Sequence, residues 1–247
     1  MTVETTEREA TGAGALRRPV EIQSMFDRIV RRYDLMNRLM TGGQDIAWRR
    51  KAARVAIGPG TERVLDVATG TGDLAIELFR QGAPLVVGID FAQGMLDSAA
   101  EKLAANGGSR IVLLRSDAMR LPFPDATFDA CTVAFGLRNM IDYQAAVSEM
   151  ARVLRPGGRL VILEMTPVRN PLFRTVFGIY FDRIVPFVGG VISGDPEAYS
   201  YLPRSVSAFP DARRLGLMMR RAGLEQVRFK LLMMGTVALH VGVKKAW

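Results

Sequence analysis

Three aspartates follow one another along the first half of the chain, each at or near the end of a short apolar run. Asp66 lies within RVLDVA, Asp90 closes PLVVGID, and Asp117 follows RIVLLRS. If these runs are strands, a carboxylate at a strand end can accept hydrogen bonds from ribose hydroxyls or from the amino group of an adenine. The three residues therefore indicate a site for a ligand that contains adenosine.

A glycine loop lies between the first of these runs and the helical pattern behind it. Its letters, Gly70-x-Gly72-x-x-Ala75, fit the pattern of dinucleotide sites and also a loop that holds S-adenosylmethionine. Glycine has no Cβ, so the backbone can approach a ligand closely, and the following helix offers free N–H groups at its positive end. The loop alone therefore suits both a pyrophosphate and a methionine carboxylate.

Asp73 helps to separate these two ligands. It lies in the first turn of the expected helix behind the loop, where its charge would repel a pyrophosphate. Acids are also common in first helical turns because they stabilise the helix. Taken singly, Asp73 and Asp117 have ordinary structural explanations. Together with Asp66 and Asp90 they suit a ligand with one adenosine, one ammonium group and no phosphate, so the sequence favours S-adenosylmethionine over NAD as the cofactor.

The rest of the chain supplies the elements that must position these side chains. Apolar runs of strand length alternate with helical patterns, which predicts a Rossmann-like α/β fold, a mainly parallel sheet with helices on both faces. We expect seven strands, over 63–68, 84–90, 110–117, 128–136 and 159–165, with two more within 225–245. We expect helices over 73–82, 92–108, 143–158 and 211–224.

Two segments depart from this alternation. Residues 1–19 are polar and rich in Thr and Glu, which predicts a disordered tail without the apolar core of a signal peptide. Residues 20–57 have apolar positions three and four apart, typical of N-terminal helices. Residues 170–204 are aromatic and contain Pro and Gly, and charged residues interrupt them, so we expect an inserted cap and no transmembrane helix. Residues 20–247 are expected to form one domain.

Charge and composition limit the partners. The net charge is +8, and the segment from Arg28 to Arg54 contains eight basic residues and only two acidic ones. This cluster indicates either a solvated helix face or contact with an anionic membrane; nucleic acid is disfavoured because aromatic residues do not alternate with the cations. Cys131 is the only cysteine, which fits a reducing compartment. The lone His240 suits a structural role, and no metal site is expected.

Longer motifs resemble known enzymes. VLDVATGTGD, GIDFAQGML, LPFPDATFD and VLRPGGRLVILE are similar to successive motifs of class I S-adenosylmethionine-dependent methyltransferases. MFDRIVRRYDLMNRLMTGGQDIAWRR, FGLRNM, YSYLPRSVSAFP and TVALHVGVKK more narrowly resemble the C-methyltransferases of ubiquinone and menaquinone biosynthesis. The resemblance extends from about Met25 to Lys244 in the order of the family.

The resemblance implies which residues hold the cofactor. In this family the contacts fall on positions that match Thr71, Asp90, Asp117 and Ala118. Ala134 departs from the family, which usually has a serine before its Phe-Gly-Leu-Arg-Asn motif, so one side-chain contact to the cofactor is in doubt. Thr69 stands where glycine is common in the family.

The implied reaction is methylation of a ring carbon on a quinol with a polyprenyl tail. We favour demethylmenaquinol as the substrate and menaquinol as the product; the alternative is 2-polyprenyl-6-methoxy-1,4-benzoquinol of ubiquinone synthesis, or both substrates, and no residue decides between them. The ring carbon attacks a methyl group once the neighbouring hydroxyl loses its proton, so the site should favour a phenolate. Position and resemblance make Arg138, with Asn139 beside it, the expected electrostatic group. Tyr33 is a second candidate on the substrate side, although a helix–helix junction would explain it equally well.

The expected partners follow from this substrate. They are the polyprenylated quinol and an anionic membrane surface, which the aromatic residues of segment 170–204 would meet; a buried crossover helix explains that segment equally well. A homodimer is compatible with the sequence, and no nucleic acid is expected. We expect a cytoplasmic protein, with peripheral attachment to the inner face of the plasma membrane as the alternative to free diffusion.

Overall fold

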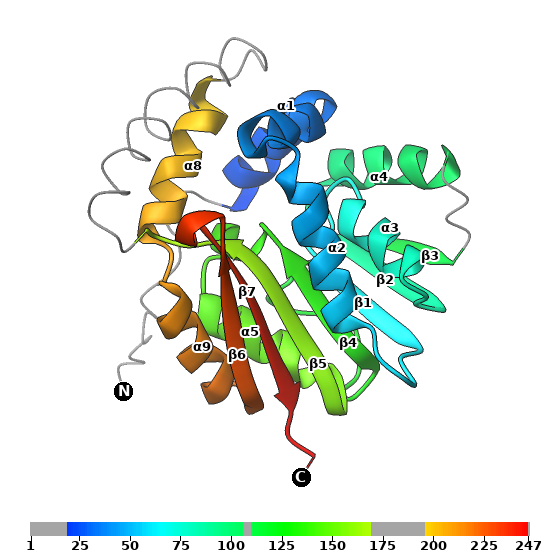
Figure 1. The fold of residues 1–247 in the computed structure, drawn as a ribbon. Coiled ribbons are helices and arrows are strands. Elements are labelled where there is room, and N and C mark those ends of the chain that lie inside the picture. Colours follow the sequence, from blue (N-terminus) through cyan, green and yellow to red (C-terminus); the bar gives the residue numbers. More distant parts are fainter. Residues whose placement is uncertain (1–18, 106–109, 169–195, 247) are drawn as a thin grey trace, which may run out of the picture.

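The computed structural model describes residues 19–105, 110–168 and 196–246. In these residues seven strands form one sheet with helices on both faces (Figure 1). The strands are β1 Arg63–Val67, β2 Leu85–Asp90, β3 Ile111–Arg115, β4 Phe128–Ala134, β5 Leu154–Met165, β6 Leu224–Leu232 and β7 Val237–Lys244. They fall on the seven expected runs, which confirms the Rossmann-like α/β fold and its seven-stranded sheet.

The strand order is β3-β2-β1-β4-β5-β7-β6. Strands β3, β2, β1, β4 and β5 pair in parallel, and β7 pairs antiparallel with β5 and β6. The chain first builds outward from β1 through β2 to β3 and then returns to add β4 on the other side of β1. In such sheets a ligand binds beyond the carboxyl ends of the strands where the order reverses, which is the space above β1 and β4.

Alternating side chains of β1 divide the core into two halves. Val64 packs in the apolar cluster under α2 Gln44–Ala56 and α3 Asp73–Arg80, whereas Leu65 and Val67 pack in the cluster under α5 Tyr143–Arg152 and α9 Ala212–Arg221. Helix α4 Gln93–Ala105 covers β2 and β3. Because side chains alternate along a strand, Asp66 shares the α2 and α3 side with Val64, and this orientation decides its surroundings.

Helix α1 Pro19–Thr41 lies at the carboxyl end of the parallel strands (Figure 1). Gly42 and Gly43 both have positive φ angles of 58° and 74° and turn the chain from α1 into α2. Apolar side chains of α1, among them Met25 and Met36, pack with Tyr201 of α8 Pro196–Ala208. The expected tail and most of the expected cap lie outside the described residues, so the division into tail, domain and cap stays a prediction.

One expected boundary is wrong. The helix expected over 143–158 ends at Arg152, and Leu154 already begins β5. Residues 156–158, the Pro-Gly-Gly segment that was expected to close the helix, therefore lie in the strand. Arg155 is held there by Asp129 of β4, with 2.8 Å between Nη1 and Oδ1, and the pairing of β4 with β5 shifts register nearby. A long-range contact overrides the local helix-ending pattern.

Candidate active site

Three cavities lie at the carboxyl-end edge of the sheet. The first cavity is bounded by the ends of β1 to β4 and by α1, and it spans about 960 Å³ including its opening to solvent, within the size range of small-molecule sites. Five residues that the sequence predicts for cofactor binding line it: Gly70, Asp90, Asp117, Ala118 and Ala134. The structure thus brings together predicted residues from four separate strand ends.

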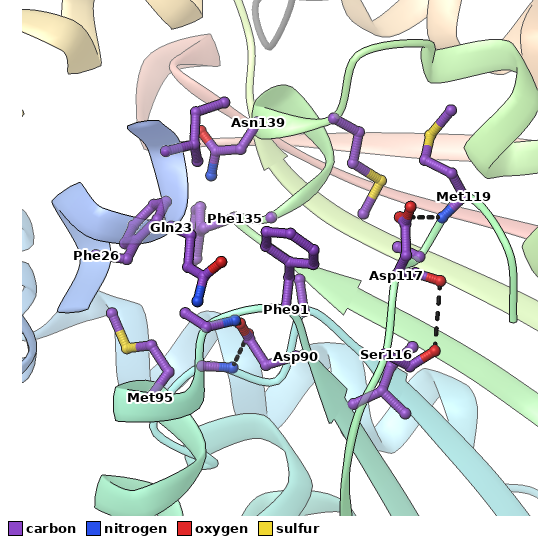
Figure 2. Close-up of a pocket in the computed structure, with 18 of the residues that line it drawn as sticks. Gln23, Phe26, Asp90, Phe91, Met95, Ser116, Asp117, Met119, Phe135 and Asn139 are labelled. Atoms are coloured by element: carbon purple, nitrogen blue, oxygen red, sulfur yellow. Dashed lines mark hydrogen bonds between the residues drawn. The ribbon is translucent and has the colours of Figure 1, made fainter. Parts of the chain in front are cut away.

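Helix α1 supplies the side of the first cavity that faces these strand ends. Gln23 and Phe26 of α1 stand opposite Asp117 and Met119, with Phe91 between them (Figure 2). The lining thus combines aromatic and thioether groups with a few carboxylates, which suits a flat, partly polar ligand such as adenosine.

Asp90 ties the glycine loop to the end of β2. Its Oδ2 accepts from the backbone N–H of Gly70 at 2.8 Å, and its Oδ1 accepts from that of Ala92 at 2.9 Å. Burial raises the pKa of Asp90 above its ordinary value, although these N–H groups act in the opposite direction. Each carboxylate oxygen can accept a further hydrogen bond, so Asp90 can still receive the hydroxyls of a ribose.

Asp117 and Ala118 lie at the opposite end of the first cavity. The Oδ1 of Asp117 accepts from the backbone N–H of Met119 at 2.8 Å and holds the turn after β3 (Figure 2). The side chain of Asp117 is exposed at the cavity edge. This placement is compatible with a carboxylate that accepts from an adenine amino group.

The second cavity surrounds the glycine loop and contains Asp66, which therefore stands apart from Asp90 and Asp117. Asp66 is 1% exposed, and its two oxygens accept from Thr132 Oγ1 at 2.6 Å and from Thr69 Oγ1 at 2.7 Å. Burial raises the pKa of Asp66 to about 6, although both hydroxyls and the charge of Arg49 act to lower it. Thr69, where the family commonly has glycine, thus supplies a partner for a buried carboxylate.

Thr71 connects the glycine loop to α1. Its Oγ1 donates to Asp34 Oδ1 at 2.7 Å, and Lys102 of α4 donates to Asp34 Oδ2 at 2.6 Å. Gly72 has a φ angle of 82°, which favours glycine, and a Cβ at this position would stand only 3.3 Å from the Cβ of Ala99. Thr71 and its neighbours thereby fix α1 above the loop.

Asp73 carries a compensated charge. Lys102 Nζ lies 2.7 Å from its Oδ1, and Arg38 Nη2 lies 3.2 Å from its Oδ2. Although burial opposes ionisation, Lys102, Arg49 and Arg38 hold the pKa of Asp73 below its ordinary value. Because two cations neutralise Asp73, its repulsion of a phosphate is weaker than the sequence suggested. The choice of cofactor therefore depends on the other residues.

The third cavity lies between α1, α2, α8 and the ends of β5 and β7. Trp48 and Phe135 give it two aromatic faces, and Met40, Met165 and Met233 line it as well. Arg138, the residue expected to stabilise a phenolate, also lines this cavity. Its lining is apolar and aromatic with a small number of charged groups, a combination suited to an aromatic ring with polar substituents.

Arg138 is buried and paired with an acid that the sequence analysis did not single out. Its Nη1 donates to Glu164 Oε1 at 2.9 Å and also to the backbone oxygen of Phe135. Burial opposes the charge on Arg138, but the neighbouring Glu164 outweighs it and raises the pKa of the guanidinium above its ordinary value. The Nε of Arg138 is buried and makes no hydrogen bond with any described residue, so one donor of the guanidinium is unsatisfied.

Six residues mark where the cavities meet. Tyr33 lines all three, Phe135 lines the first and the third, and Arg49 lines the second and the third. The first and the second also share Ala68, Gly70 and Ala134. A ligand that fills the first two cavities and a ligand in the third would therefore face each other at Tyr33 and Phe135.

The backbone at this junction is strained. Ala68 and Phe135 have φ angles of 52° and 58°, in the left-handed region that costs most residues about 1–2 kcal/mol. Gly136 permits the two segments to approach, because a Cβ there would stand 2.5 Å from the Cβ of Ala68. Strained residues of this kind concentrate at functional sites.

Asn139 lies on the other side of this junction from Arg138. It lines the first cavity, although the sequence paired it with Arg138 as a catalytic group. Its Oδ1 is buried and makes no hydrogen bond with any described residue. This orphaned acceptor fits a ligand that donates hydrogen bonds, as adenosine and an amino acid ammonium group do.

Three residues of the site were missed in the sequence. Arg49 and Glu164 are buried charges, and Lys102 joins α4 to the glycine loop. Glu164 had a local signal, since it follows four apolar residues of a predicted strand. Arg49 and Lys102 had none, because each lies in a helix among other charged residues.

The remaining reactive side chains lie away from the three cavities. Cys131 is fully buried, and burial raises the pKa of its thiol well above the ordinary value. His240 is buried with Nε2 at 2.8 Å from the backbone oxygen of Ala212. Within the described residues, no three His, Cys, Asp or Glu side chains are grouped so that they could hold a metal ion.

The fold and the first two cavities together define a class I S-adenosylmethionine-dependent methyltransferase. Among solved structures, the [4+2]-cyclase SpnF aligns over 92% of this chain and 96% of its own, with TM-score 0.68 and 20% identity. A possible histamine N-methyltransferase from Thermotoga maritima aligns over 91% of this chain and all of its own, with TM-score 0.63 and 18% identity. These likenesses establish the fold.

The chain belongs to the ubiE/COQ5 methyltransferase family, whose model matches residues 15–244. Demethylmenaquinone methyltransferase of Thermus thermophilus is 51% identical and is matched over 88% of this chain and 99% of its own. The enzymes of the same name from Deinococcus radiodurans and Mycobacterium marinum are 50% and 46% identical, over 91% and 92% of this chain. The chain is therefore an S-adenosylmethionine-dependent methyltransferase.

Proposed function

We propose that this enzyme methylates the ring carbon of demethylmenaquinol and forms menaquinol. The observation that carries the proposal is the junction at Tyr33 and Phe135, where a cavity sized for adenosine adjoins a separate aromatic cavity with a buried cation. The relatives at 46–51% identity, all named demethylmenaquinone methyltransferase, support this substrate over the benzoquinol of ubiquinone synthesis.

The cofactor would occupy the first and second cavities. Asp90 would accept from the ribose hydroxyls, and Asp117 with the N–H of Ala118 would bind the adenine edge. The second cavity would hold the methionine part, with Asp66 near its ammonium group. The orphaned Oδ1 of Asn139 and the open space around Gly70, where a Cβ would meet nothing within 4 Å, support this fit. When bound, S-adenosylmethionine supplies an electrophilic methyl group.

The quinol ring would occupy the third cavity. Trp48 and Phe135 would pack against the ring, and the charge of Arg138 would act on a ring oxygen. A nearby permanent cation favours the phenolate over the neutral phenol, and the phenolate directs electron density to the neighbouring ring carbon. After methyl transfer the cofactor would leave as S-adenosylhomocysteine, and this carbon would lose its proton to water, which restores the aromatic ring.

Peripheral membrane contact is part of the proposal, because a polyprenyl tail partitions into the bilayer. None of the described helices is both long and apolar enough to cross a membrane. The outer side of α1 suits a bilayer surface: Leu35 and Leu39 are 53% and 51% exposed, four residues apart on one helix face. Arg31 and Arg32 are exposed one turn earlier. A homodimer stays a prediction.

Assay of the purified enzyme with reduced demethylmenaquinone and labelled S-adenosylmethionine tests the function. We expect label in menaquinone, and a deletion strain should accumulate demethylmenaquinone. Transfer only to the methoxy-benzoquinol, or no transfer to either ring, would refute the proposed substrate. Equilibrium dialysis supplies the cofactor control: S-adenosylhomocysteine should bind and NAD should not.

A further inference from the structure

Arg49 of α2 is a buried cation with most of its donors unused. It is 8% exposed, and its Nη1 donates to Asp45 Oδ2 at 2.6 Å within the same helix. The guanidinium carbon lies 5.2 Å from the ring centroid of Phe135. Nε and Nη2 of Arg49 make no hydrogen bond with the residues that the structure describes. Neither nitrogen is among the fully buried unpaired atoms of the described residues, so both keep some accessible surface and can donate to a ligand.

Arg49 lines the second cavity together with Asp66 and Thr71, and it lines the third cavity as well. The positive charge of Arg49 also acts to lower the pKa of both Asp66 and Asp73, so the guanidinium lies close to the two carboxylates on either side of the glycine loop. An anion bound here would therefore stand between Arg49 and the positive end of α3.

The charges around the second cavity leave Arg49 as the cation that serves an anion. Arg38 is directed to Asp45 and Asp73, with 3.1 and 3.2 Å between the charged atoms, and Lys102 is directed to Asp34 and Asp73. Neither Arg38 nor Lys102 lines the second cavity. Two acids, Asp66 and Asp73, line the same cavity; Asp73 is paired with Arg38 and Lys102, so Asp66 is the acid that could face a ligand ammonium. A zwitterion fits this arrangement, with its cationic end near Asp66 and its anionic end near Arg49.

We propose that Arg49 binds the carboxylate of the cofactor's amino acid end and thereby positions the sulfonium at the junction of Tyr33 and Phe135. The inference rests on the proposed function, since it assumes a methionine moiety in the second cavity. The planar guanidinium matches a carboxylate with two parallel donors, and Phe135 keeps that plane in one orientation. Arg49 acts as a positioning residue, because its charge does not take part in the bond changes.

The third cavity offers Arg49 a different role, as a donor to the quinol. The described geometry favours the carboxylate, because Arg138 already supplies a cation to the third cavity, whereas Arg49 is the one cation among the described residues that line the second. The two roles predict different affected ligands, so a binding experiment can decide between them.

A pair of ligands isolates the proposed contact. S-adenosylhomocysteine carries the amino acid end, and 5′-methylthioadenosine lacks it but keeps the adenosine. Calorimetry on the full chain should show that Arg49→Met lowers the affinity for S-adenosylhomocysteine by about tenfold or more, as expected for a lost charged hydrogen bond. The affinity for methylthioadenosine should stay unchanged. Arg49→Lys should recover part of the affinity, because an ammonium keeps the charge but lacks the fork.

Arg50 provides the matched control. It is the next residue on α2, its side chain is 56% exposed, and its Nε stands 3.7 Å from Glu77 Oε1, so Arg50→Met removes the same charge without touching the cavity. We expect unchanged affinity for both ligands. Asp45 keeps Arg38 as a partner in the Arg49 variants, and unchanged methylthioadenosine binding would report an intact site.

Several outcomes would overturn the inference. An equal loss for both ligands would make Arg49 a structural residue, and no loss for either would remove it from the site. A raised KM for the quinol with unchanged S-adenosylhomocysteine affinity would assign Arg49 to the third cavity. If the wild-type protein bound neither adenosine ligand, the proposed function itself would fail, and that result is distinct from all the others.

Discussion

The guanidinium of Arg138 and the carboxylate of Glu164 form an ion pair of 2.9 Å in which both side chains are buried. Glu164 also accepts from the backbone N–H groups of Arg138 at 3.2 Å and Met165 at 2.9 Å. The acid thus holds both the side chain and the backbone of the loop after β4. Arg138 is fixed by this pair at the third cavity, where its charge would act on a bound substrate.

Arg138→Ala should lower turnover by about a hundredfold or more, the usual effect of removing one group that stabilises developing charge. Affinity for S-adenosylhomocysteine should change little, because Arg138 lines the third cavity and not the first. Activity of the variant should recover as pH rises, since solution hydroxide then removes the quinol proton. Steady-state kinetics from neutral to alkaline pH measure this; a deficit that is equal at every pH would exclude the role.

Glu164→Gln should destabilise the fold by about 3–5 kcal/mol, because it leaves the Arg138 charge buried without its partner. Urea unfolding measures the free-energy change. Asp125→Asn is the control: Asp125 pairs with Arg152 at 2.7 Å but is 78% exposed, so its loss should cost at most about 1 kcal/mol. Similar losses for both variants would contradict the buried-pair account.

Asp90→Ala should weaken S-adenosylhomocysteine by at least about tenfold, because the ribose hydroxyls lose a charged acceptor, worth about 1.5–3 kcal/mol for each hydrogen bond. The glycine loop also loses the acceptor for the Gly70 N–H. Calorimetry provides the measurement, and an unchanged affinity would remove Asp90 from the ribose site.

The raised pKa of Asp66, about 6 against 3.8, predicts a pH-dependent stability. Ionisation of Asp66 is harder in the folded than in the unfolded chain, so its contribution is most favourable below about pH 4 and is lost as pH rises through about 6. The full change is about 3 kcal/mol. The unfolding free energy of the wild type minus that of Asp66→Asn should therefore decrease as pH rises through this range. A difference that is constant from pH 4 to 7 would show that Asp66 titrates normally.

Membrane contact through α1 predicts that Leu35→Glu with Leu39→Glu weakens binding to vesicles that contain anionic lipid. Two exposed apolar groups would be lost from the surface and two negative charges added. Leu217→Glu is the control, because Leu217 is 54% exposed but lies on α9. Vesicle flotation should show weaker binding for the α1 double variant and unchanged binding for Leu217→Glu. Equal binding of wild type and the α1 variant at low salt would refute contact through this face.

Local pattern in the sequence was enough for the strands, most helices and the glycine loop. The two periods of hydrophobicity, near two and near 3.6 residues, depend on neighbours along the chain. The position of Asp90 at the end of β2 followed from the same pattern, and the shared carboxyl edge of parallel strands indicated a ligand site there. The family resemblance added the prediction that Arg138 stabilises a phenolate, and it identified Ala134 as a departure from the usual serine.

Only the tertiary structure decided which charges meet. Asp66 lies under the glycine loop, apart from Asp90, because its place in β1 turns it toward α2 and α3. Glu164 neutralises Arg138 across 26 residues of sequence, and Lys102 joins α4 to α1. Arg49 lines the second and third cavities because α2 packs over β4 and β5. Such contacts depend on which helix faces and loops converge in space, and no local period along the chain encodes that convergence.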